Sequence, residues 1–324
     1  MCNCSKVAIA TLLFLYLPNI MKRFLFFFIF FYQHLFAQEQ VVKSVLLDSV
    51  TIFGVQDDFD VDEFIYYVKT DTTFYIGFKN LRYFSHKYKS ELNLFNKKSE
   101  KIGVLKKWGT HHSDNKNAWV VNDSIYDEGK IFKRNGKYKF YTPDAFDEVF
   151  FPKDTIEVSL NISRIKNKKQ SQNMRDAKMI GFSIGTDNTE QKKGGVSKKL
   201  AIFDVNMRQY YDYTIGLTNY KERDCYTFTV EVKKDLNKKD LGQALIRKIV
   251  SYFDKENFNV IYREYKFFYK HFLVDLDIDV VINMEYVNGI HVPIDIYYKG
   301  FWDFPFFKPE RASFELKLYD YQIN

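Results

Sequence analysis

We predict a mainly β fold of the α+β class, in which an N-terminal helix packs on a large curved antiparallel sheet that forms a half-open barrel. Three observations predict it. Apolar and polar residues alternate from residue 87 onward, which is typical of antiparallel strands with one buried face. Helical spacing is concentrated in residues 60–84. Asn-Gly pairs, which favour type I′ hairpin turns, punctuate the strand-like runs.

The first 37 residues have the layout of a cleavable secretory signal. Met21-Lys22-Arg23 is a basic start, residues 24–32 are an unbroken apolar run, and the stretch ends at Ala37. The run is shorter than the roughly 20 residues that span a bilayer, although a buried helix or membrane anchor is the alternative. We expect export to the periplasm, outer envelope or medium, cleavage near Ala37, and Met21 as the true start, which would exclude residues 1–20.

Removal of the first 37 of 324 residues leaves a chain long enough for one large β domain. We assign residues 38–59 to an N-terminal strand (41–53) with an acidic connector, and residues 60–324 to a single β-rich domain. The net charge falls from +7 to +4 because the removed part holds three bases and no acids. The remaining bases form no stripe, so we expect no nucleic-acid partner. Cys225 alone remains, and its strand context favours a structural residue over a reactive nucleophile.

Residues 60–84 contain two apolar faces at helical spacing. Asp71 can cap the second helix by accepting hydrogen bonds from its free N–H groups, while Gly77 disfavours one continuous helix. The first face is formed by Phe64, Ile65 and Val68, and the second by Phe74, Phe78 and Leu81.

The remainder of the chain is predicted to form strands, turns and one short helix. Residues 143–150 predict that helix, with Thr142 as its N-cap and Pro143 in its first turn. Alternating runs lie at residues 88–94, 156–162, 226–232 and 314–318, and turns are predicted at 135–136, 254–257 and 288–289.

This arrangement resembles the periplasmic lipoprotein-carrier superfamily, the LolA/LolB-like fold. The resemblance is carried by the N-terminal helix, the meander, and the late hairpin with its turn at Phe253-Asp254-Lys255 followed by Ile261-Tyr262-Arg263-Glu264. Residues 71–82 and 298–303 also resemble uncharacterised exported envelope proteins. The likeness covers residues 60–320 as a pattern. It implies a periplasmic binding or chaperone role for acyl chains, and it transfers no functional residue.

One pattern matches the nucleophile elbow of serine hydrolases. Gly181-Phe182-Ser183-Ile184-Gly185 has the spacing that exposes a serine on a strained turn, and His271 and His291 follow it. However, a polar loop follows Gly185 where the elbow needs a helix, so a strand that ends at a glycine is the favoured interpretation.

Three other clusters have both a chemical and a structural interpretation. Asp275, Asp277 and Asp279 share one strand face, but they lack a calcium-loop pattern and are typical of a solvated face paired with Lys299 across a hairpin. His111-His112 with Asp114 predicts a solvent loop rather than a metal site, since adjacent side chains on an extended chain point opposite ways. Residues 192–199 predict a basic surface loop, with peripheral membrane contact as the alternative. We expect no metal or cofactor.

The sequence therefore favours a non-enzymatic exported envelope protein that binds a hydrophobic or acylated ligand, or acts as a periplasmic chaperone. The expected site is an apolar concavity under the 60–84 helix. The aromatic residues near the C-terminus are expected to seal the barrel's last corner, with a hydrophobic lip for an acyl or peptide ligand as the functional alternative. These residues are Tyr298, Phe301, Trp302, Phe304, Phe306 and Phe307. Expected partners are an acyl chain, a lipoprotein or another envelope protein. The first alternative is a structural or assembly partner of another envelope protein, and the second is a serine hydrolase that uses Ser183. The expected ligand-binding residues are Phe74, Phe78, Leu81, Tyr298 and Trp302.

Overall fold

The computed structural model of this chain describes residues 50–54, 59–158, 199, 201–271, 274–303 and 308–323. The chain divides into two compact units, Met1–Val45 and Leu46–Asn324, and every described residue lies in the second. The expected signal segment and Ser183 lie outside the described residues. Within these residues, no helix has the length and apolar character needed to cross a bilayer.

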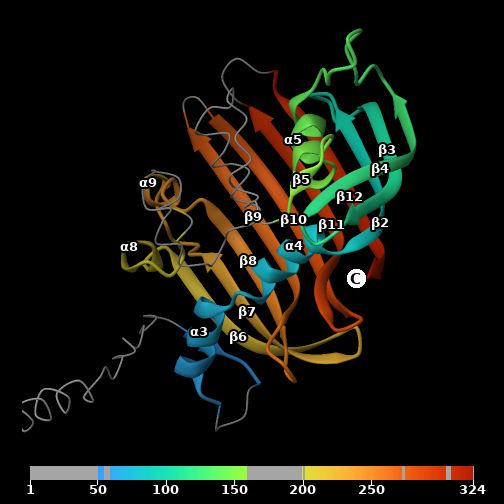
Figure 1. Ribbon diagram of the computed structural model, residues 1–324. Coiled ribbons are helices and arrows are strands. Elements are labelled where there is room, and N and C mark those ends of the chain that lie inside the picture. Colours follow the sequence, from blue (N-terminus) through green and yellow to red (C-terminus); the bar gives the residue numbers. More distant parts are fainter. Residues whose placement is uncertain are drawn as a thin grey trace, which may run out of the picture. The chain divides into compact units, whose positions relative to one another are not determined.

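One large sheet dominates the described chain, as predicted (Figure 1). Its strands run in the order β1-β6-β7-β8-β9-β10-β11-β12-β2-β3-β4-β5, and only the β1–β6 pair is parallel. The described sheet is curved and stays open, with β1 at one edge and β5 at the other. The strands are β1 (Val50–Ile52), β2 (Ser85–Phe95), β3 (Lys101–Ser113), β4 (Asn117–Glu128), β5 (Ile156–Glu157), β6 (Tyr211–Tyr220), β7 (Arg223–Val232), β8 (Ile246–Asp254), β9 (Val260–His271), β10 (Val274–Val287), β11 (Ile290–Asp303) and β12 (Glu310–Gln322).

The predicted N-terminal helix is a pair of helices, α3 (Val61–Thr70) and α4 (Thr73–Tyr83). The break falls at Asp71, whose Oδ1 accepts hydrogen bonds from the backbone N–H (2.8 Å) and hydroxyl (2.5 Å) of Thr73. The carboxylate satisfies one free N–H at the start of α4, as predicted for Asp71, although the N-cap position itself is Thr72, which makes no side-chain cap hydrogen bond. Both predicted apolar faces are buried.

Gly77 allows α4 to approach the sheet closely. A Cβ atom at this position would lie 2.3 Å from Cε of Met284 in β10 and 3.3 Å from Nδ1 of His291 in β11. The side chain of Asn80 also donates a hydrogen bond to the carbonyl of His291 (2.8 Å). Glycine has a low helix propensity, but at this position its missing side chain lets α4 pack directly against β10 and β11.

Helix α5 (Tyr141–Phe150) lies across the same face of the sheet as α3 and α4 (Figure 1). The predicted N-cap, Thr142, is wrong: the N-cap position is Phe140, and Thr142 sits in the first turn. The cap comes from β12, where the carboxylate of Glu310 accepts hydrogen bonds from the N–H groups of Tyr141 (2.7 Å) and Thr142 (2.9 Å). A partner 168 residues away replaces the local cap. Two four-residue helices, α8 (Val205–Arg208) and α9 (Lys238–Leu241), complete the described helices.

The chain turns at all three predicted positions, but of the two Asn-Gly pairs only Asn288-Gly289 forms the predicted type I′ turn, because Asn135 is not at positive φ. Asn288 (φ 52°) and Gly289 (φ 82°) join β10 to β11 with both residues at positive φ, as a type I′ turn requires. Gly136 (φ 74°) turns the chain between the bridged residues Phe132 and Tyr138. The predicted hairpin at 254–257 joins β8 to β9. Of the strand predicted at 41–53, the described part is β1.

Candidate functional site

The five predicted ligand-binding residues form two groups, one in α4 and one on β11 beneath α5. Phe74 and Phe78 face the sheet from α4, where they are 3% and 2% exposed and their rings lie 5.1 Å apart. Tyr298 and Trp302 lie on β11 under α5, with Tyr298 5.0 Å from the ring of Phe146. Leu81, at the C-terminal end of α4, lines a small cavity.

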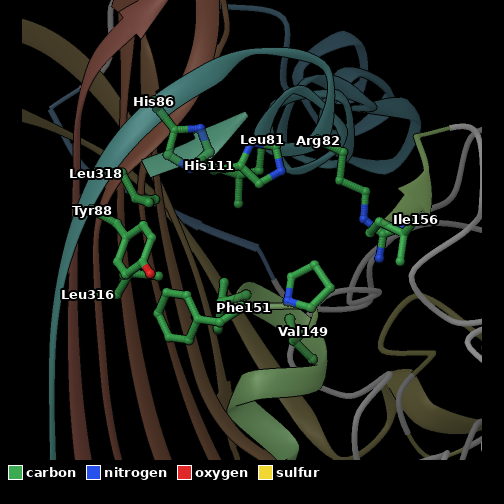
Figure 2. A pocket seen from close by; sticks show the side chains of 12 residues that line it. Leu81, Arg82, His86, Tyr88, His111, Val149, Phe151, Ile156, Leu316 and Leu318 are labelled. Carbon is green, nitrogen blue, oxygen red and sulfur yellow. The ribbon is translucent and has the colours of Figure 1, made fainter. Parts of the chain in front are cut away.

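That cavity lies where the C-terminal ends of α4 and α5 meet the sheet (Figure 2). Its volume of about 30 Å³ exceeds the roughly 10–15 Å³ that a cavity needs to hold a water molecule. Apolar side chains form most of its wall, and two imidazoles and a guanidinium form the rest. The lining residues are Leu81, Arg82, His86, Tyr88, His111, Val149, Phe150, Phe151, Pro152, Ile156, Leu316 and Leu318.

The two imidazoles, His86 and His111, stack on each other with centroids 4.7 Å apart and ring planes 13° apart. The predicted solvent loop at His111-His112 is therefore wrong, because the alternation of β3 continues through both residues. It turns His111 inward, while His112 is half-buried and stacks on Trp119 at 5.5 Å.

Burial keeps both cavity imidazoles neutral. It is the largest cause that lowers the pKa of His86 to about 4, and together with the neighbouring His86 it lowers the pKa of His111 to about 3. Within the described residues, Nδ1 of His111 has no hydrogen-bond partner. Burial also lowers the pKa of Arg82, but a guanidinium remains charged at neutral pH. The cavity thus combines one cation, two neutral rings and an apolar wall.

A buried charged cluster fixes α5 to the sheet. The ammonium of Lys107 in β3 lies 2.7 Å from both carboxylate oxygens of Asp147 in α5, and Tyr138 donates its hydroxyl to the same carboxylate (2.5 Å). Burial raises the pKa of Asp147 and lowers that of Lys107, and their mutual attraction opposes both shifts. Our sequence reasoning missed this cluster, although Lys107 occupies a core-facing position in the alternation of β3, which was its signal.

A second buried pair fixes the junction of α3 and α4, and it was also missed. Nη2 of Arg263 in β9 lies 3.5 Å from Oδ2 of Asp71, and its Nε donates to Ser251 (3.0 Å). The guanidinium lies 4.3 Å from the ring centroid of Phe74. Together the two pairs hold the helices at set positions over the sheet, because an unpaired buried charge is costly.

A larger cleft lies at one end of the sheet, and we call it the rim cleft. It measures about 450 Å³ and is formed where β2 and β11 end and where β3, β12 and α5 begin. The register places Arg311 opposite both Phe301 and Phe95, and its guanidinium lies 4.7 Å from the ring centroid of Phe301. The described lining residues are Leu94, Phe95, Asn96, Lys97, Ile102, Phe140, Phe301, Asp303, Lys308, Pro309, Glu310 and Arg311.

The remaining sequence clusters occupy structural positions. Asp277 and Asp279 are exposed on β10, and Asp279 is in register with Lys299, as the solvated-face interpretation predicts. Cys225 is fully buried in β7, as its strand context predicts, and burial raises the pKa of its thiol to about 11. In the part of the chain that the structure describes, no three His, Cys, Asp or Glu side chains gather as a metal site would need.

No protein-family model matches this sequence, and no curated protein sequence matches it. Among solved structures, it is similar to a DUF1329 family protein from Desulfovibrio piger ATCC 29098, with 10% identity and a TM-score of 0.24 over 78% of this chain and 92% of that one. A putative outer membrane lipoprotein-sorting protein domain from Vibrio parahaemolyticus gives 11% identity and a TM-score of 0.24 over 77% and 90%. Lipovitellin gives 8% identity and a TM-score of 0.26 over 74% of this chain and 25% of that one. Likeness at these values says nothing about what this chain binds.

Proposed function

We propose that this protein is an exported envelope protein that binds an apolar or acylated ligand without catalysing a reaction on it, as a carrier or periplasmic chaperone. The rim cleft is the observation that supports the proposal best. Its volume of about 450 Å³ falls within the roughly 300–1,000 Å³ of ligand pockets in general. Its walls are mainly apolar and include two phenylalanines from β strands, Phe95 and Phe301, and a third, Phe140, from the start of α5.

The residues expected from sequence take three roles in this proposal. Trp302 packs against Tyr141 at 6.0 Å, next to the cleft residue Phe140, so Tyr298 and Trp302 support the cleft wall from the helix-covered face. Phe74 and Phe78 hold α4 on the sheet. Leu81 lines the small cavity, which has room for water but not for an acyl chain, so it has a packing role at the end of α4.

Of the two sites, the rim cleft is the one large enough for an acyl chain. It lies at the N-terminal end of α5 and the small cavity at its C-terminal end. A helix of 10 residues is about 15 Å long at 1.5 Å per residue. Along this length the ring of Phe146 stacks on that of Phe314 at 4.2 Å and Lys107 pairs with Asp147, so the packing of α5 on the sheet separates the two sites. We therefore propose the rim cleft as the ligand site.

The test is binding of a fluorescent fatty-acid analogue to Ile102→Asp and its matched control, Ile125→Asp. Both isoleucines are partly exposed, at 39% and 50%, but only Ile102 lines the rim cleft. We expect saturable binding by the natural protein, a loss of about tenfold or more in Ile102→Asp because a carboxylate enters an apolar wall, and no change in Ile125→Asp. Absence of saturable binding by the natural protein, or equal losses in both variants, would reject the proposal.

A second candidate function, assembly with another envelope protein, is favoured by the outer edge of β4. Strand β5 pairs only with Asn117 and Ala118, so within the described residues the edge from Trp119 to Glu128 has no neighbouring strand. An exposed edge is a template for strand addition. A photocrosslinking residue at Ile125 should then give one discrete adduct in the native envelope, and no adduct when it is placed at the exposed Lys299.

A further inference from the structure

We infer that the rim cleft selects ligands whose apolar chain carries an anionic head group. The inference rests on the proposed ligand-binding function and adds a chemical class to it. Three basic residues line the cleft: Lys97 between β2 and β3, Lys308 just before β12, and Arg311 within β12. All three are exposed, so their charges face the ligand's side of the wall rather than the core.

The acidic residues of the cleft do not cancel these charges. Glu310 is 8% exposed, and its carboxylate accepts three hydrogen bonds from the start of α5, two from backbone N–H groups and one from the hydroxyl of Thr142 (2.7 Å). The positive end of the helix therefore balances its charge. Asp303 is then the one acid left against three bases among the described lining residues.

The three bases are also uncommitted to internal ion pairs. Across the described ranges, none of them lies within ion-pair distance of a carboxylate. The guanidinium of Arg311 instead lies over the ring of Phe301, its neighbour in the register. A ligand chain that lies on the rings of Phe301 and Phe95 would thus bring its terminal acid beside the guanidinium of Arg311. The planar array of N–H donors in a guanidinium matches the geometry of carboxylate and phosphate groups.

The experiment uses two pairs of amphiphiles that differ only in the head group, below their micelle concentrations. A fatty acid is compared with its methyl ester, and lysophosphatidic acid with the monoacylglycerol of the same chain. The variant is the triple substitution Lys97→Gln, Lys308→Gln and Arg311→Gln. The control removes the same charge at exposed lysines outside the cleft, by Lys234→Gln, Lys238→Gln and Lys239→Gln.

We expect the natural protein to bind the anionic member of at least one pair about five- to tenfold more tightly than its neutral partner at low salt. The cleft variant should lose that preference, and salt of about 0.5 M should reduce it, whereas the control should retain it. The pair with the larger preference identifies the head group as carboxylate or phosphate.

Two results would overturn the inference, and they are distinguishable. Equal binding of charged and neutral members, or a preference that survives in the cleft variant, rejects head-group selection and leaves the proposed function standing. Failure of all four amphiphiles to bind rejects the proposed function as well.

Discussion

At the scale of single residues, the surroundings of the stacked imidazoles of His86 and His111 disfavour their protonated form. Both are 5% exposed beside the charged Arg82, so protonation would place a second and third cation in a nearly dry site. Burial is accordingly the largest cause of their lowered pKa values, about 4 and about 3. The unfolded chain protonates these rings near pH 6.5, which makes folding pH-dependent.

We therefore predict that the protein loses stability as pH falls below about 6.5. Between that pH and the folded pKa values, the unfolded state binds more protons, so stability rises with pH and is fully present above about pH 6.5. At pH 5 the expected loss is about 2 kcal/mol for each ring, since one pKa unit corresponds to about 1.4 kcal/mol. Urea unfolding at pH 7 and pH 5 measures it.

The matched variant is His111→Phe, which keeps an aromatic ring and removes one titrating group. Between pH 7 and pH 5 it should lose about 2 kcal/mol less stability than the natural protein, which is the contribution of one ring. His291, whose pKa burial also lowers, remains in both proteins and supplies a common background. An identical pH dependence in variant and natural protein would show that the stacked pair does not titrate in this range.

At the scale of elements, the helices differ in how they meet the sheet. Helix α4 docks by close packing, with Gly77 against Met284, whereas α5 is held by charged groups at both its start and its middle. Buried pairs of this kind contribute position more than stability. The contrast makes α4 the element in which the contribution of core packing can be measured by substitution.

We predict different outcomes for Phe78→Ala and Leu81→Ala. Phe78 is 2% exposed and lies outside the small cavity, so its truncation should cost about 3–5 kcal/mol and change ligand uptake little. Leu81 is 9% exposed and already faces the small cavity, so its truncation should cost less, about 2–3 kcal/mol, and should also leave uptake by the rim cleft unchanged. Denaturant melts and fluorescence titrations measure both. A loss of uptake in Leu81→Ala but not in Phe78→Ala would show that the ligand reaches Leu81.

At the scale of the whole molecule, local patterns and distant pairings account for different parts of the structure. Alternation in residues 226–232 and the Asn288-Gly289 turn predicted strands and hairpins, because both depend on neighbours in sequence. The insertion of β12 between β11 and β2 could not be predicted in this way, since it joins Arg311 to Phe95. The same distance hid the Lys107–Asp147 pair and the rim cleft, whose described lining residues come from four strands and the residues next to them and from the start of α5.

The position of β12 predicts that residues 60–324 unfold as one unit. The strand pairs with β2 on one side and β11 on the other, so the early hairpins and the late meander share a continuous sheet and neither is complete without it. We expect the exported protein, with Gln38 as its first residue by intact mass, to unfold in a single cooperative transition. All three tryptophans, Trp108, Trp119 and Trp302, lie in β3, β4 and β11, whereas far-ultraviolet circular dichroism also reports β6 to β9. Coincident fluorescence and dichroism curves are therefore expected, and separate midpoints would mean that β6 to β9 form an independent domain.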